Sequence, residues 1–173
     1  MLKATLQKAK RPPSRRQNNM EPGWLPVAAP AFFEQVVTRG LALPHCHALG
    51  LQLQAASHGK TTLVLPFKPD WVGNPLTRVL HGGVVTTLAD SAGALAIYTL
   101  LTEPESVATL DLRIDYLRLG LADLPLYCQA ECYRLTSQIA FTRSILYQQN
   151  PDTPVAQAVA TYMRSAAPKG GGR

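Results

Sequence analysis

The hydrophobic pattern divides the chain into one helix that is apolar on nearly every side and several alternating segments. Across residues 82–101, apolar side chains recur around most of a helix circumference, which predicts a long buried helix. A shorter helix is predicted at 31–39, ended by Gly40. Six strands are predicted, at 49–55 and 61–67 before the long helix and at 107–118, 126–135, 139–149 and 154–164 after it.

The links between these segments indicate how the strands pair. The last four strands are joined by short turn-forming links at 120–123, 136–137 and 150–152, and short links imply antiparallel neighbours. A turn at 58–60 joins the first two strands, and residues 68–80 form a loop. Covering the buried helix then requires a curved antiparallel six-stranded sheet wrapped around one long central helix. This α+β arrangement is the hotdog fold.

The formal charge of +6 lies in the first 20 residues. Residues 1–20 contain six of the 17 Lys and Arg residues and no acid, so the other 11 balance the 11 Asp and Glu. The domain therefore has no net basic charge, which argues against a nucleic-acid partner. We expect a disordered or extended basic tail at 1–30, one hotdog domain at 31–165 and a flexible tail at 166–173.

The basic, acid-free start of the chain has two other interpretations. It is also typical of a transit peptide, and Met20 is an alternative start of the protein. No apolar run approaches the ~20 residues of a membrane span, so no membrane partner is expected. We expect a soluble, cytoplasmic protein.

The three cysteines, Cys46, Cys128 and Cys132, are odd in number and have apolar neighbours, which predicts reduced core residues rather than disulfides. His45 and His47 flank Cys46, but no second cluster completes a four-ligand metal site. We therefore expect no metal.

Two glycines, Gly82 and Gly83, open the long helix. The first amides of a helix have no acceptor within it, and with the positive end of the helix dipole they suit an oxyanion developing on a carbonyl. Glycine also lets a ligand approach the backbone closely. The alternative is that the two glycines only bend the chain into the helix.

Asp90 is the only charged side chain between Arg78 and Glu103. Aspartate is a poor residue for a helix interior, and an unpaired buried carboxylate is costly. Because this helix offers no cationic partner, Asp90 is a candidate nucleophile or general base.

The spacing of these residues indicates assembly. Gly82 and Asp90 are eight residues apart, which is about 12 Å along a straight helix. A carbonyl held on the Gly82 amide needs its attacking group about 3–3.5 Å away. If both residues act on one substrate, Asp90 must come from a second subunit whose helix runs antiparallel alongside. This predicts a two-fold homodimer with two sites.

Three further polar residues lie near these positions in the sequence. Asn74 is either a ligand for a carbonyl or water, or an ordinary turn residue beside Pro75. His81 is an acid or base, or, as we favour, orients the loop by hydrogen bonding. Thr109, on the strand after the helix, is a candidate for positioning a hydrolytic water.

The segment His81-Gly82-Gly83, with an acid nine positions after the histidine, resembles the hotdog thioesterase superfamily. The resemblance is closest to its phenylacetate-pathway (PaaI-like) branch, which is similar to one class of 4-hydroxybenzoyl-CoA thioesterases. It covers roughly residues 45–165, and the strand at 109–118 also fits the branch's pattern.

The resemblance implies an acyl-CoA thioesterase without a cofactor, since coenzyme A is part of the substrate. The thioester carbonyl would be bound by the Gly82 amide, beside Gly83, with help from Asn74. Asp90 of the partner chain would attack the carbonyl or activate a water that Thr109 helps to place. The family's assembly is commonly a homodimer or a dimer of dimers.

One position departs from the family's pattern. Its Asn or Gln tends to lie six positions before the histidine, whereas Asn74 lies seven before His81. A one-residue loop insertion would absorb the difference.

The phosphates of coenzyme A would need cations near the mouth of the site. Arg78, Arg113 and Arg118 are available as substrate-binding residues. An ordinary strand cation paired with Asp111 or Asp115 explains Arg113 equally well.

Two other functions stay open. A hotdog dehydratase or hydratase acting on acyl thioesters needs a histidine and an acid facing one another across the dimer, and His81 followed at once by glycines fits an oxyanion turn better. In a non-catalytic acyl-thioester binding module, Asp90 would have no chemical role.

Overall fold

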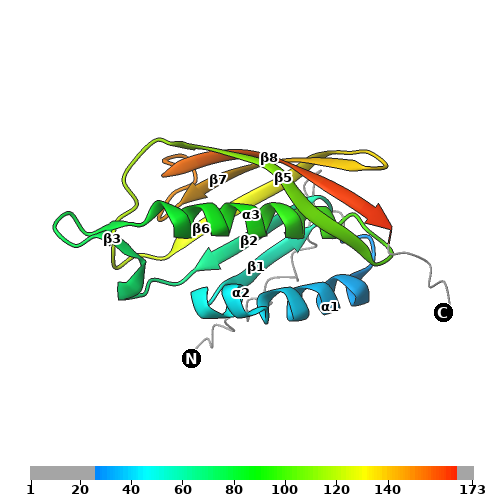
Figure 1. The fold of residues 1–173 in the computed structure, drawn as a ribbon, viewed down its shortest axis with the longest axis horizontal. Helices are drawn as coiled ribbons and strands as arrows, with labels where there is room; N and C mark the ends of the chain where they lie inside the picture. The colour runs from blue at the N-terminus through cyan, green and yellow to red at the C-terminus, as the bar shows by residue number, and fades with distance from the viewer. Residues whose placement is uncertain (1–25, 167–173) are drawn as a thin grey trace, which may run out of the picture.

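A computed structural model describes residues 26–166 of the protein (Figure 1). Most of the two predicted tails, 1–25 and 167–173, lies outside the described residues. The elements are α1 Pro30–Leu41, α2 Pro44–Leu49, β1 Gln52–Ser57, β2 Lys60–Leu65, the 3-10 helix η1 Pro69–Trp71, β3 Val72–Asn74, β4 Val79–Leu80, α3 Gly82–Tyr98, β5 Glu105–Tyr116, β6 Leu126–Leu135, β7 Ile139–Tyr147 and β8 Ala156–Ala166.

The six long strands form one antiparallel sheet in the order β1-β2-β6-β7-β8-β5. The sheet curves over α3, and α1 and α2 run along the other side of the molecule, near β1 (Figure 1). This confirms the predicted hotdog fold. It also makes β1 and β5 the two edge strands of the sheet.

The core lies between α3 and the concave face of the sheet. The side of α3 that meets the sheet buries small and large apolar residues: Val85, Leu88, Ala89, Ala92, Leu95, Ala96 and Ile97. The strands contribute Leu63, Leu65, Leu126, Leu146 and Tyr162, which are all buried. The close packing of these side chains provides the main hydrophobic stabilisation of the domain.

The prediction that α3 is buried on nearly all sides is wrong for the single chain. Thr86, Thr87, Asp90, Ser91 and Ala94 are only partly buried. The reason is that the sheet covers one side of the helix, and short side chains occupy the side that it leaves open.

The segment before β1 also differs from its prediction. Leu49, assigned by alternation to a strand, instead ends the short helix α2. Pro44 starts this helix, and Gly50 caps it in the left-handed conformation with φ of 73°. Proline at the first position and glycine just past the end are the usual boundaries of a helix, here one too short for its periodicity to be recognised.

The buried cysteines fit their predicted role as core residues. Cys128 and Cys132 are buried in β6, and Cys46 is half-buried in α2. Burial raises the pKa of the Cys128 thiol to about 12. A thiol in this environment stays protonated and unreactive.

Candidate active site

Asp90 lies in the middle of α3, on the edge of its open side. Its carboxylate oxygen Oδ1 accepts a hydrogen bond of 2.7 Å from the Thr109 hydroxyl on β5. None of the ion pairs formed among residues 26–166 includes Asp90. The carboxylate is therefore held by a neutral donor and keeps lone pairs available for chemistry.

Tyr162 on β8, which the sequence pattern did not distinguish from other strand residues, holds the backbone of Asp90. Its side chain is only 1% exposed, and its hydroxyl donates to the Asp90 backbone carbonyl at 3.0 Å. Burial, followed by the charge of the Asp90 carboxylate, raises the pKa of Tyr162. The hydroxyl therefore stays protonated and acts as a donor. This fixes the turn of helix that carries Asp90 against β8.

Gly93 makes room for this tyrosine. A Cβ atom at position 93 would lie 2.3 Å from the Tyr162 hydroxyl oxygen and 3.1 Å from Thr142 Oγ1. A glycine inside an otherwise apolar helix is the one sequence signal that another group approaches the backbone at this point. The sequence did not show which group this would be.

The first turn of α3 uses its two glycine amides differently. The Gly83 N–H donates to His81 Nδ1 at 2.9 Å, so the histidine is the N-cap of the helix. A nitrogen that accepts a hydrogen bond carries no proton, so a neutral His81 ring has its proton on Nε2. No acceptor among residues 26–166 binds the Gly82 N–H. Of the two amides, the one at Gly82 is thus free for a ligand.

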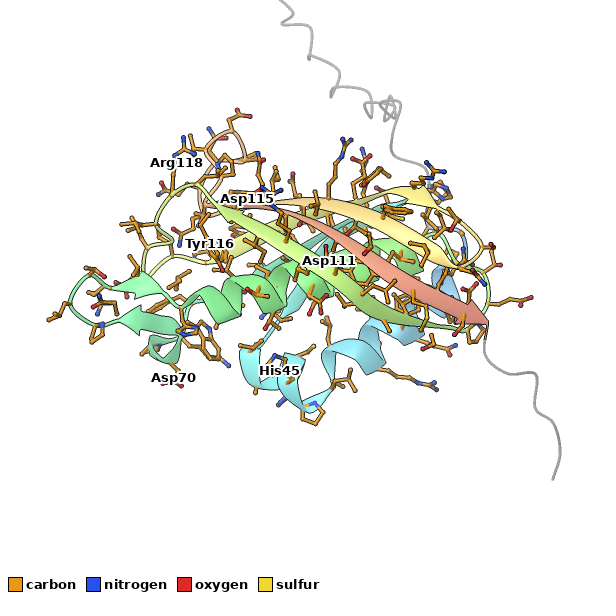
Figure 2. The ribbon with its side chains drawn as sticks, turned by 45° about the horizontal axis from the view of Figure 1, so that its top comes forward. His45, Asp70, Asp111, Asp115, Tyr116 and Arg118 are labelled. Atoms are coloured by element: carbon orange, nitrogen blue, oxygen red, sulfur yellow. The ribbon has the colours of Figure 1, made fainter. Side chains whose placement is uncertain are left out.

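Tyr116, another residue that the sequence analysis did not select, contacts the same turn. Its hydroxyl donates to the Gly82 carbonyl at 3.1 Å, and Thr86 Oγ1 donates to the same oxygen at 3.0 Å. Figure 2 shows Tyr116 at the end of β5, beside the first turn of α3.

Asn74 lies in the hairpin formed by β3 and β4. Its side-chain oxygen accepts hydrogen bonds from the backbone N–H groups of Leu76 and Thr77, at 2.9 and 3.4 Å. These bonds form the turn of the hairpin, as expected for an ordinary turn residue. The side-chain oxygen of Asn74 is thus occupied by the turn, and the predicted part of Asn74 beside the Gly82 amide stays a prediction.

The β3–β4 hairpin, which leads into His81, contains a bulge at Gly73. Val72 pairs with Leu80 but Asn74 pairs with Val79, so Gly73 is the extra residue. A Cβ atom at Gly73 would lie 2.8 Å from the Cα of His81. Only glycine permits this close approach of the hairpin to the N-cap of α3.

The three candidate arginines differ in their bonds. Arg78 forms an ion pair with Asp123, in which one guanidinium nitrogen lies 2.9 and 2.7 Å from the two carboxylate oxygens. Arg113 binds Asp115 at 2.9 Å, which is one of the two pairings considered from the sequence. Arg118 donates to the Pro154 carbonyl at 3.0 Å, and no carboxylate among residues 26–166 pairs with it.

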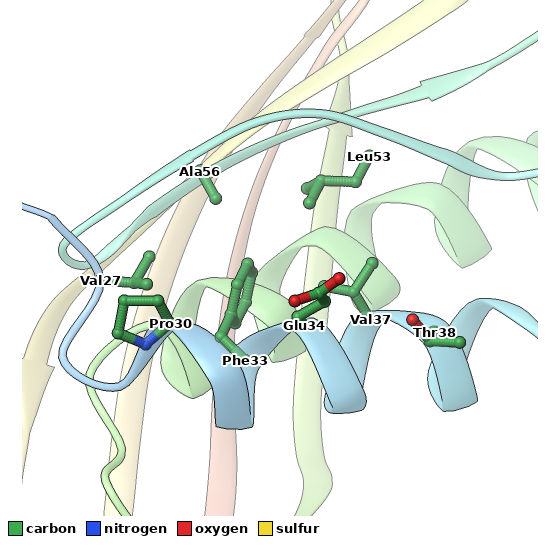
Figure 3. Close-up of a pocket in the computed structure, with 8 residues that line it drawn as sticks. All are labelled: Val27, Pro30, Phe33, Glu34, Val37, Thr38, Leu53 and Ala56. Atoms are coloured by element: carbon green, nitrogen blue, oxygen red, sulfur yellow. The ribbon is translucent and has the colours of Figure 1, made fainter.

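A hollow of about 320 Å³ lies elsewhere, between α1 and β1 (Figure 3). It is lined by Val27, Pro30, Phe33, Glu34, Val37, Thr38, Leu53 and Ala56. Thr109 lies on β5, at the opposite edge of the sheet from β1, so this hollow is separate from the site formed by Asp90 and Thr109.

The fold is that of the hotdog proteins, and comparisons with known proteins show the family to which the chain belongs. The sequence profile of the thioesterase superfamily matches residues 78–155. The medium/long-chain acyl-CoA thioesterase YigI of Salmonella typhimurium is 31% identical over 134 residues, which are 70% of this chain and 85% of YigI. The chain belongs to the thioesterase superfamily and is a thioesterase.

Two solved structures show the same likeness. A Pseudomonas aeruginosa protein is 40% identical, with a TM-score of 0.69 over 78% of this chain and 99% of its own. A mutant of the phenylacetic acid degradation protein PaaI from Thermus thermophilus is 28% identical, with a TM-score of 0.62 over 71% of this chain and 100% of its own. Within residues 26–166, no helix has the length and apolar character needed to cross a bilayer.

Proposed function

We propose that the protein hydrolyses acyl-CoA thioesters, with Asp90 of one subunit and the Gly82 amide of a second subunit at each site. The observation that carries this proposal is the Asp90 carboxylate. It is half-buried, bound by the Thr109 hydroxyl and not paired with a cation among residues 26–166. A charge kept in this environment costs stability and is a candidate for chemistry.

The need for two subunits follows from α3. Gly82 is its first residue and Asp90 its ninth, so about 12 Å of rigid helix separates them. The open side of α3 carries short side chains that permit a second helix to pack closely. β5 pairs only with β8 in the described chain, so its outer edge is available to the β5 of a second copy. A two-fold axis between the copies would place two antiparallel α3 helices side by side.

The chemistry then follows from the two groups. The Gly82 N–H and the positive end of the helix dipole stabilise the oxyanion that forms on the thioester carbonyl. The Asp90 carboxylate either takes a proton from water as it adds to the carbonyl carbon, or attacks that carbon itself to form an anhydride that water cleaves. In both routes the C–S bond breaks and the thiolate of coenzyme A takes up a proton.

Thr109 supports the reaction by orienting the Asp90 carboxylate. By donating to Oδ1, the hydroxyl of Thr109 leaves the second oxygen of Asp90 available to a water or a carbonyl carbon. Arg118, whose guanidinium has no carboxylate partner among residues 26–166, is the candidate of the three for a coenzyme A phosphate. The likeness to YigI favours medium and long acyl chains as substrates.

The proposal is tested by measuring thiol release from a panel of acyl-CoAs with short, medium, long, branched and aromatic acyl groups. We expect steady release with multiple turnovers, fastest for medium or long chains. An absorbance change at the enoyl wavelength without thiol release would identify a dehydratase or hydratase. Binding of acyl-CoA without either signal would identify a binding module.

Mixed dimers test the contribution of two subunits. We expect the Asp90→Asn and Gly82→Val chains to be inactive alone and to recover activity when co-expressed, because the mixed dimer has one intact site. Random pairing makes half the dimers mixed, with one working site of two, so roughly a quarter of wild-type activity returns. Measured kcat per subunit after co-purification decides this. If mass spectrometry shows that mixed dimers have formed but no activity returns, the Asp90 carboxylate and the Gly82 amide of each site would have to come from the same chain.

A further inference from the structure

Tyr116 contacts the helix start in a way that burial does not explain. Its side chain is 55% exposed, so its ring contributes little to the core of the described chain. Its hydroxyl nevertheless lies 3.1 Å from the Gly82 carbonyl oxygen and 3.5 Å from Thr86 Oγ1. The Gly82 carbonyl already accepts from the Thr86 hydroxyl at 3.0 Å. The bond from Tyr116 is thus an additional restraint on a group that is already satisfied.

This restraint acts on one peptide unit. The peptide between Gly82 and Gly83 is held at its oxygen by Tyr116 and Thr86, and at its N–H by His81 Nδ1 at 2.9 Å. Two consecutive glycines would otherwise be the most flexible start that a helix can have. The Gly82 N–H, which no group among residues 26–166 accepts, belongs to the preceding peptide, whose carbonyl at His81 accepts from a backbone N–H of the same helical turn at 3.1 Å. With both peptides held, the backbone of Gly82 has little freedom to turn its N–H.

We propose that Tyr116 is a positioning residue that orients the Gly82 amide toward the oxyanion, acting through the Gly82 carbonyl. This inference rests on the proposed function, since it assigns the Gly82 amide to the thioester carbonyl. Misplacement of a group by about 1 Å reduces a rate by about 10²-fold, so a tyrosine that fixes this peptide contributes to kcat without contacting the substrate.

The test is Tyr116→Phe, which removes only the hydroxyl. We expect kcat to fall about 10-fold or more, as loss of alignment costs less than loss of an oxyanion donor. KM is expected to stay within about threefold, because the mutation removes an interaction that matters in the transition state. Tm is expected to change by less than about 4 °C, and the oligomeric state is expected to stay the same. The matched control is Tyr147→Phe, which removes a hydroxyl bonded to Gln129 on the same sheet and is expected to leave kcat unchanged.

A spectroscopic readout separates positioning from a purely structural role. A ketone analogue of an acyl-CoA, in which CH₂ replaces sulfur, carries a carbonyl that can be labelled with ¹³C. Bound to the wild type and to Asp90→Asn, its resonance is expected to move downfield because the Gly82 N–H polarises it. Bound to Tyr116→Phe, it is expected to move less.

The contact itself is tested by a double mutant. A Cβ atom at Gly82 would lie 2.9 Å from the Tyr116 hydroxyl oxygen but 3.5 Å from the next ring atom. We therefore expect Gly82→Ala to lower Tm more in the wild type than in Tyr116→Phe. Strictly additive Tm changes would overturn the contact.

The outcomes distinguish this inference from the function that it rests on. If the wild type releases thiol and Tyr116→Phe has the same kcat and ¹³C shift, the positioning role is wrong and the thioesterase proposal stands. If Tyr116→Phe is monomeric while the wild type is not, Tyr116 is an interface residue instead. If the wild type releases no thiol from any acyl-CoA, the proposed function fails first.

Discussion

Replacing Asp90 with asparagine is expected to lower kcat for thioester hydrolysis by about 10³-fold or more, as removal of a nucleophile or general base does in other hydrolases. Asparagine has the same shape, and its amide oxygen still accepts from the Thr109 hydroxyl. What it loses is the negative charge that takes a proton or attacks the carbonyl. The measurement is steady-state thiol release, with KM determined in the same experiment.

Stability should change in the opposite sense. The half-buried carboxylate has no cation to compensate for its desolvation among residues 26–166, so Asp90→Asn is expected to keep or raise Tm. The control is Asp152→Asn, which removes the same charge from an exposed turn before β8 and is expected to leave kcat unchanged. Wild-type kcat in Asp90→Asn would exclude both proposed routes.

The largest expected effect on stability comes from Gly93→Ala. The added methyl would lie 2.3 Å from the hydroxyl oxygen of Tyr162, which is 1% exposed and has no free space to move into. Overpacking of this kind costs about 1–3 kcal/mol, and losing the bond from Tyr162 to the Asp90 carbonyl adds about 1 kcal/mol. Alanine's better helix propensity returns only about 1 kcal/mol. We expect Tm to fall by roughly 4–10 °C in thermal unfolding followed by circular dichroism.

Gly40→Ala is the matched control for this substitution. Gly40 also lies in a helix, α1, but no atom lies within 4 Å of a Cβ placed there. Here only the propensity term acts, so Tm is expected to stay the same or rise. If Gly93→Ala unfolds at the wild-type temperature, the close approach of Tyr162 to α3 is not present in solution.

The fold was predictable because its two determinants are local in sequence. The apolar character of residues 82–101 marked the central helix, and the short links between later strands fixed their antiparallel order. Features that were missed depend on few residues: α2 has six residues, and the β3–β4 hairpin has strands of three and two residues. Periodicity needs longer segments than these to be recognised.

The candidate site was predictable only in part, for a different reason. Asp90 and the two glycines are residue types that are unfavourable in a helix, so each of them stands out in the sequence by itself. Tyr116 and Tyr162 fit an ordinary strand pattern, and their roles come from contacts 34 and 72 residues away in the chain. Their hydroxyl groups become significant only when the sheet is wrapped around α3. Asn74 gives its side-chain oxygen to the turn of its own hairpin, and its part at the site stays a prediction.

The two edges of the sheet are unequal, and this limits how far copies of the chain can add to one another. β1 has six residues, an irregular register with β2 at Leu53 and Ala55, and α2 immediately before it. β5 has 12 residues. In the proposed dimer the two long β5 edges pair with each other and only the short, irregular β1 edges remain exposed. Growth by strand addition would then stop at two copies instead of continuing into a fibre.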